Sequence, residues 1–105
     1  MIKIVKKLYE ETYSPKLTPE LLVSNLTLDN YTKINFEKVH GILEAHVFCF
    51  LEDHTEAEYI YKFKDNLLIK LESNIDNIKE TIYCREKEKQ KILDQINYFK
   101  EIKKA

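Results

Sequence analysis

Glycine is nearly absent from this chain of 105 residues, and Gly41 is its single example. P-loops and dinucleotide-binding turns need several glycines, because the backbone must approach the phosphate closely. The sequence therefore excludes both nucleotide-binding motifs. It has only two prolines, no Gly/Ser-rich stretch and no internal repeat. Because no linker divides the chain, we expect a single domain over residues 1–105.

Arginine and cysteine are also scarce. Arg85 is the only arginine among seventeen basic residues. Since the planar guanidinium is the group that reads guanine edges and clamps phosphates, this scarcity counts against sequence-specific recognition of DNA. Cys49 and Cys84 could form one disulfide bond, but a chain with this apolar content does not need it. We expect free thiols.

No long hydrophobic run is present either. The main apolar stretch, residues 45–51, is far shorter than the about 20 residues that cross a bilayer. The N-terminal segment reaches Glu10 and Glu11 before an apolar signal core can form. We therefore expect a cytoplasmic protein without a membrane span.

Charge is abundant but unevenly distributed. Residues 1–16 carry four lysines and two glutamates, and residues 17–58 carry eight acidic residues and two lysines. Residues 59–105 carry eleven basic and eight acidic residues. Such a chain can present acidic and basic parts to different partners or to a second copy of itself, or it can simply have an uneven surface.

Two short helices are expected near the N-terminus. Apolar residues at steps of three and four predict a helix over residues 2–12. Thr18 as N-cap and Pro19 at the first helical position predict a second helix that ends at about Ser24. Turn-forming Asp and Asn side chains then predict a loop over residues 27–33.

The middle of the chain is ambiguous between helix and strand. Residues 35–52 place apolar side chains at helical spacing, which predicts a central helix, although the part from Ile42 onward also fits a buried strand. In residues 56–73, large apolar side chains recur at every second position on either side of Asp65 and Asn66. This alternation predicts a β-hairpin, with which a helical phase competes.

The C-terminal third has the strongest pattern. Residues 74–104 place apolar positions at steps of three and four without a glycine or proline, which predicts one long amphipathic helix. At about 1.5 Å per residue it would be about 45 Å long, whereas a compact domain of this size has a radius of gyration of about 13 Å. We therefore expect its far end to form a coiled-coil contact in a homodimer, through Ile92, Ile96 and Phe99. Alternatively, the helix reverses near Arg85, or it packs entirely on its own core.

Together these elements predict an α+β fold that is mainly α: short N-terminal helices, a central helix, a small β-hairpin and a long C-terminal amphipathic helix. An all-α bundle is the alternative. The order of elements is similar to that of small dimeric winged-helix regulators, in which the third helix enters the DNA groove and the last helix dimerises. The central segment of this chain is acidic, which is the wrong sign for binding phosphate.

One stretch, HVFCFLEDH at residues 46–54, contains the residue types of a metal site. If it is helical, His46, Cys49 and Asp53 lie on one face and become candidate ligands, whereas a strand points His46 and Cys49 to opposite faces. Structural zinc sites normally use paired ligands such as CxxC, so we assign no metal or cofactor. We assign no catalytic residue, because Cys49 lies among acidic and aromatic residues and Cys84 has no histidine nearby.

By elimination, the sequence predicts a non-catalytic protein-binding or regulatory domain, such as an inhibitor, an adaptor or an assembly subunit. Its seven tyrosines suit this function, since tyrosine combines a large apolar area with a polar tip. The expected partner is another protein, and a second copy of this chain is expected to bind as well. A winged-helix DNA-binding regulator is the alternative function.

Overall fold

The computed structural model of the chain describes residues 2–13 and 17–104. Helix α1 (Ile2–Tyr13) and the short helix α2 (Pro19–Ser24) are followed by a 3₁₀ turn, η1 (Asn25–Thr27). Five strands come next, and helix α3 (Arg85–Lys104) follows the last strand directly. The strands are β1 (Tyr31–Val39), β2 (Ile42–Phe50), β3 (Glu56–Lys64), β4 (Leu67–Ile75) and β5 (Ile78–Cys84).

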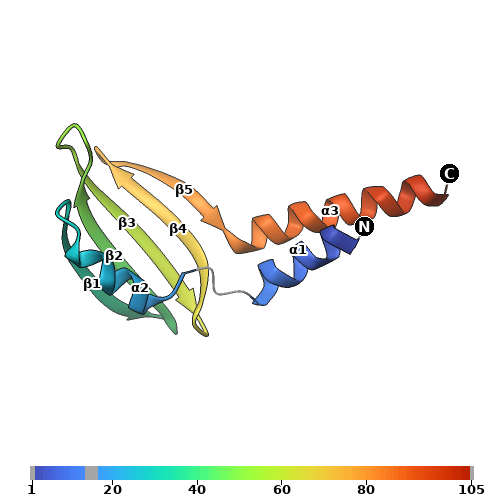
Figure 1. Ribbon diagram of the computed structural model, residues 1–105, viewed down its shortest axis with the longest axis horizontal. Coiled ribbons are helices and arrows are strands. Elements are labelled where there is room, and N and C mark those ends of the chain that lie inside the picture. The colour runs from blue at the N-terminus through green and yellow to red at the C-terminus, as the bar shows by residue number, and fades with distance from the viewer. Residues whose placement is uncertain (1, 14–16, 105) are drawn as a thin grey trace.

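The five strands form one antiparallel meander, in which each strand pairs with its neighbours in the sequence (Figure 1). Positive φ angles occur at both residues of three tight turns, which are His40 with Gly41, Asp65 with Asn66, and Asp76 with Asn77. Two successive positive φ angles define the type I′ turn, whose twist matches the twist of a β-hairpin. Aspartate and asparagine adopt this conformation more readily than most residues. The meander is therefore built with a single glycine.

The expectation of a mainly α fold is wrong, and so is the all-α alternative. Instead of a central helix, residues 35–50 form the second half of β1, a turn at His40 and Gly41, and β2. Their apolar residues at helical spacing are divided between two paired strands. The C-terminal helix begins at Arg85 rather than at residue 74, because the preceding residues complete β4 and form β5. Without a central helix, the element order that is similar to winged-helix regulators is also absent.

Three local predictions are confirmed. α1 covers the helix expected over residues 2–12, and α2 begins at Pro19 as expected. The Thr18 side chain caps α2 by accepting a hydrogen bond from the backbone N–H of Leu21 at 3.4 Å. The hairpin expected over residues 56–73 is the β3–β4 pair.

One face of the sheet carries the hydrophobic core. Ala45 and Val47 of β2 point to this face, since alternate residues of a strand share a side. They form a buried cluster with Phe63, Leu68 and Leu22. Leu22 comes from α2, which lies across the sheet near β1 and β2 (Figure 1). The short helix α2 thus closes the core from outside the sheet.

Helices α1 and α3 pack side by side and project away from the sheet (Figure 1). This helical hairpin makes the molecule elongated, with a longest extent of 55 Å and a radius of gyration of 17.1 Å. A compact chain of this length would have a radius of gyration of about 13 Å. In the described part of the chain, no helix is long and apolar enough to cross a membrane.

A buried polar junction connects the helical hairpin to the sheet. Arg85 begins α3 and is 3% exposed. Its Nε donates to the carbonyl of Leu68 at 2.8 Å, and its Nη1 donates to the carbonyl of Glu11. The Tyr83 hydroxyl donates to the Glu11 carboxylate. Burial, assisted by this hydrogen bond, raises the pKa of Tyr83 above its usual range. The end of α1, β4 and the start of α3 are thus held at one point.

Candidate functional site

The second face of the sheet carries one histidine among three glutamates. On β2, Glu44 and His46 are two residues apart and therefore point to the same face. The register of the sheet places Glu37 of β1 opposite Glu44, and it places Glu58 of β3 diagonally across from His46. We refer to Glu37, Glu44, His46 and Glu58 as the His46 cluster.

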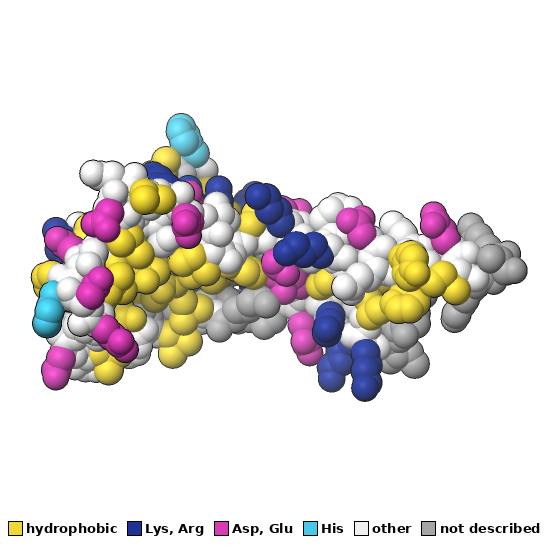
Figure 2. Space-filling model, turned by 90° about the horizontal axis from the view of Figure 1, so that it is seen from above, with side chains coloured by type: hydrophobic (Ala, Val, Ile, Leu, Met, Phe, Trp, Pro, Cys, Tyr) yellow, Lys and Arg dark blue, Asp and Glu magenta, His cyan; other side chains and the backbone are white. Residues whose placement is uncertain are grey.

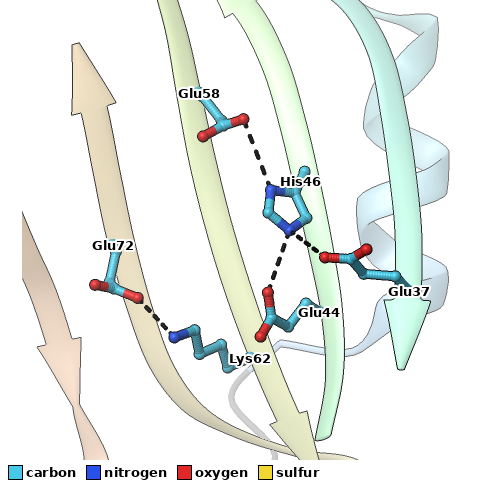
Figure 3. A network of polar contacts seen from close by, with 6 residues as sticks. All are labelled: Glu37, Glu44, His46, Glu58, Lys62 and Glu72. Carbon is cyan, nitrogen blue, oxygen red and sulfur yellow. Dashed lines mark hydrogen bonds and ion pairs between the residues drawn. The ribbon is translucent and has the colours of Figure 1, made fainter. Parts of the chain in front are cut away.

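Both ring nitrogens of His46 face carboxylate oxygens (Figure 3). Nε2 lies 3.2 Å from Oε1 of Glu44 and 3.4 Å from Oε1 of Glu37. Nδ1 lies 3.6 Å from Oε2 of Glu58. Three strands therefore direct their acidic side chains at one imidazole.

A lysine–glutamate pair lies next to the cluster. Lys62 of β3 is opposite Glu44 in the register, but its Nζ contacts Oε1 of Glu72 on β4 at 2.9 Å (Figure 3). The hydrogen bond from Lys62 lowers the pKa of Glu72, and the same hydrogen bond raises the pKa of Lys62. Within residues 2–13 and 17–104, no ion pair joins a lysine or arginine to Glu37, Glu44 or Glu58. The cluster thus carries excess negative charge.

The cluster is accessible from solvent. A hollow of about 260 Å³ borders it, lined by Asn35, Phe36, Glu37, His46, Phe48 and Glu58. His46 is 22% exposed, whereas Glu37 is 59% exposed and lies at the rim. A small ion or a polar group of a partner can therefore reach the imidazole.

The structure does not bring together the candidate ligands His46, Cys49 and Asp53. Cys49 is buried on the core face of β2, opposite to His46, and burial raises the pKa of its thiol. Asp53 lies beyond the end of β2, where its Oδ1 accepts a hydrogen bond from the backbone N–H of Thr55 at 3.0 Å. A hydrogen bond with the Thr55 side chain, and to a smaller extent the one from the Thr55 backbone N–H, lower the pKa of Asp53. Cys49 and Cys84 are both free thiols.

The glutamates of the His46 cluster were not identified in the sequence. Glu44 is two residues from His46, a spacing that places two side chains together only on a strand. Glu37 and Glu58 belong to neighbouring strands, and their proximity depends on the register set by the turns. The useful signal was the alternation of polar residues Glu44 and His46 with apolar residues Ala45 and Val47, which is typical of a strand with one buried face.

The helical hairpin is a second candidate site because it exposes apolar side chains. Of the residues expected in a self-association contact, Ile96 is 8% exposed and Phe99 is 41% exposed, whereas Ile92 is half-buried. Ile96 is therefore covered within the chain, where α3 packs against α1. Among hairpin residues whose burial is described, the exposed large apolar side chains are Val5, Tyr9, Tyr13, Leu93, Tyr98, Phe99 and Ile102.

Comparison with known proteins gives no match for this chain. No protein-family model, no curated protein and no solved structure is significantly similar to it.

Proposed function

We propose that this chain is a non-catalytic protein-binding domain that self-associates through the helical hairpin of α1 and α3. The observation that carries the proposal is the position of this hairpin, which projects from the sheet with apolar side chains exposed. A pair of helices without a further layer buries little apolar surface, whereas stable architectures cover each apolar helix face. A second hairpin packed on the first would complete a four-helix bundle.

The most exposed apolar residues of α3 form a strip along one side. Tyr98 and Ile102 are four residues apart and so lie on the same side of the helix. They are 62% and 52% exposed, respectively. Figure 2 shows hydrophobic side chains gathered on the projecting helices, beside a group of lysines. Full burial of such a side chain stabilises a structure by about 1.5–3 kcal/mol, so a contact over this strip would favour association.

A groove between the helices adds a feature that suits a second copy of the chain. It has a volume of about 520 Å³ and is lined by Ile4, Lys7, Asp94, Gln95, Tyr98 and Phe99. Lys7 and Asp94 are contributed by different helices and have opposite charges. In a two-fold symmetric pair, Lys7 of each copy can therefore approach Asp94 of the other copy. This charge complementarity favours the helical hairpin of a second copy as the partner that binds in the groove.

Light scattering over a wide range of protein concentration tests the proposal. We expect the mass of the unaltered chain to approach that of a dimer as concentration rises. Ile102→Glu or Tyr98→Glu would place a charge in the contact and weaken association at least about tenfold, equivalent to about 1.4 kcal/mol. Leu28→Glu is the matched control, because Leu28 is 51% exposed but follows η1, far along the chain from the hairpin.

Two outcomes would contradict the proposal. One is a monomer mass at every concentration. The other is a loss of association in Leu28→Glu equal to that in Ile102→Glu, which would place the contact on the sheet domain rather than on the hairpin.

A further inference from the structure

The geometry points to a metal site in the His46 cluster. We infer that it binds a divalent transition-metal ion of the zinc class, with His46, Glu44 and Glu37 as ligands. Glu58 would act as the group that orients the imidazole. This site is on the sheet and is independent of the helical hairpin, so each proposal can fail without the other.

Two of the three spacings between the ligand atoms match the coordination sphere of zinc. Around a tetrahedral Zn²⁺ with bonds of about 2.0–2.1 Å, neighbouring ligand atoms lie about 3.4 Å apart. Nε2 of His46 lies 3.2 and 3.4 Å from the nearest oxygens of Glu44 and Glu37. All three ligand atoms lie within 4.8 Å of one another. An ion can therefore enter between them with small movements of the side chains, and water can take the fourth position.

Glu58 lies on the far side of the imidazole from the ligand set. Metal-binding histidines donate the N–H of their second ring nitrogen to a carboxylate or carbonyl, which fixes the tautomer and the direction of the ring. In the metal-free chain Nε2 of His46 makes a hydrogen bond with Oε1 of Glu44 at 3.2 Å, and the Glu58 carboxylate lies 3.6 Å from Nδ1, just beyond hydrogen-bond distance. A bound ion would take the place of the proton on Nε2, and the proton of the neutral ring would then be on Nδ1, toward Glu58. The cluster thus contains a ligand set and a nearby carboxylate that can orient the ring.

Charge explains why this face would attract a cation. Three carboxylates surround the imidazole, so even a protonated His46 leaves two negative charges. Lys62 is already paired with Glu72 at 2.9 Å. Glu44 and Glu58 are only 16% and 22% exposed. A divalent ion bound between the carboxylates would balance their negative charge.

The imidazole decides which class of ion fits. Ca²⁺ and Mg²⁺ select all-oxygen sites, whereas a site with imidazole nitrogen suits Zn²⁺, Ni²⁺ or Cu²⁺. The site therefore differs from an acidic patch that attracts any cation. Its border with the hollow of about 260 Å³ gives the ion a route from solvent.

Isothermal titration of the metal-free chain with Zn²⁺ tests the inference. We expect one tight equivalent in the unaltered chain, and at least about tenfold weaker binding in His46→Gln and Glu37→Gln. Glu58→Gln should weaken binding less than either ligand variant, by about tenfold, because it removes only the orienting group. Glu37 is 59% exposed, so its replacement leaves folding intact even if His46→Gln does not fold.

Matched controls separate this site from adventitious zinc binding. His54→Gln removes another histidine, Cys84→Ser removes a half-buried thiol, and Glu80→Gln removes an exposed glutamate of β5. All three should bind Zn²⁺ like the unaltered chain. The inference is overturned by an absence of Zn²⁺ binding, by equal weakening in His54→Gln or Cys84→Ser, or by Ca²⁺ binding as tight as Zn²⁺ binding.

Discussion

Lys62 and Glu72 show how the sheet controls the charge of single residues. Their side chains are 28% and 16% exposed, and they meet at 2.9 Å on neighbouring strands. The hydrogen bond from Lys62 lowers the pKa of Glu72 below its usual 4.5. A carboxylate whose pKa is lowered by folding stabilises the folded state above its unfolded pKa. This stabilisation is lost as the pH falls through the folded pKa.

Glu72→Gln should therefore lower the free energy of unfolding by about 1 kcal/mol at neutral pH, the scale of a partly exposed ion pair. The difference from the unaltered chain should shrink as the pH falls below about 4.5, where Glu72 itself becomes protonated. Urea denaturation at neutral and acidic pH measures both values. Glu80→Gln is the control on the exposed part of β5, and an equal loss of stability in that variant would argue against a specific effect of the ion pair.

Turns are the elements that decide the fold. Asp76 and Asn77 form the turn between β4 and β5, and their φ angles are 53° and 64°. A residue other than glycine, asparagine or aspartate pays about 1–2 kcal/mol in this left-handed conformation. Without this turn, residues 74–84 could continue the helical pattern that their sequence also contains.

Asn77→Ala should destabilise the chain by about 1 kcal/mol, because alanine has no side-chain polar group to favour the left-handed conformation. Asn77→Gly is the matched control and should keep or increase stability, since glycine adopts positive φ readily. Thermal denaturation followed by circular dichroism compares the two. Equal stability of Asn77→Ala and Asn77→Gly would show that this turn does not restrain the sheet.

The sequence predicts some elements well and misses others for identifiable reasons. α2 is predictable, because Thr18 and Pro19 act within a few residues. The prediction of a helix over residues 35–52 is wrong because apolar residues at steps of three and four also occur by chance in two short paired strands. The turn at Asp76 lacks glycine and resembles the interior of a polar helix face. The His46 cluster requires the register of three strands, which no local pattern contains.

At the scale of the whole molecule, Arg85 holds the helical hairpin against the sheet. It occupies an apolar position in the helical pattern of the sequence, yet it is 3% exposed and donates to carbonyls of Leu68 and Glu11. Removing a buried charged donor leaves such carbonyls without this partner and typically costs about 1–3 kcal/mol per group. The guanidinium of Arg85 and the hydrogen bond from Tyr83 to Glu11 therefore both fix the direction in which the hairpin projects.

Arg85→Met should lower the free energy of unfolding by about 3 kcal/mol and loosen the hairpin before the sheet. Hydrogen exchange measures this: amides of α1 and of the first turns of α3 should lose more protection than amides of β2 and β3. Lys89→Met is the control one turn further along α3, where the side chain is 27% exposed and pairs with Glu86. If Arg85→Met reduced protection equally in the helical hairpin and in the sheet, a local role for the junction would be contradicted.

The helical hairpin also has a consequence for synthesis. Its two helices are the first and the last elements of the described chain, and the complete meander lies between them. As the chain leaves the ribosome, strands can pair with their neighbours in sequence, but α1 lacks the helix that it packs against until α3 emerges. The surface that we propose for self-association would thus form only on chains that have been translated through α3, so chains that still lack α3 would not enter the assembly.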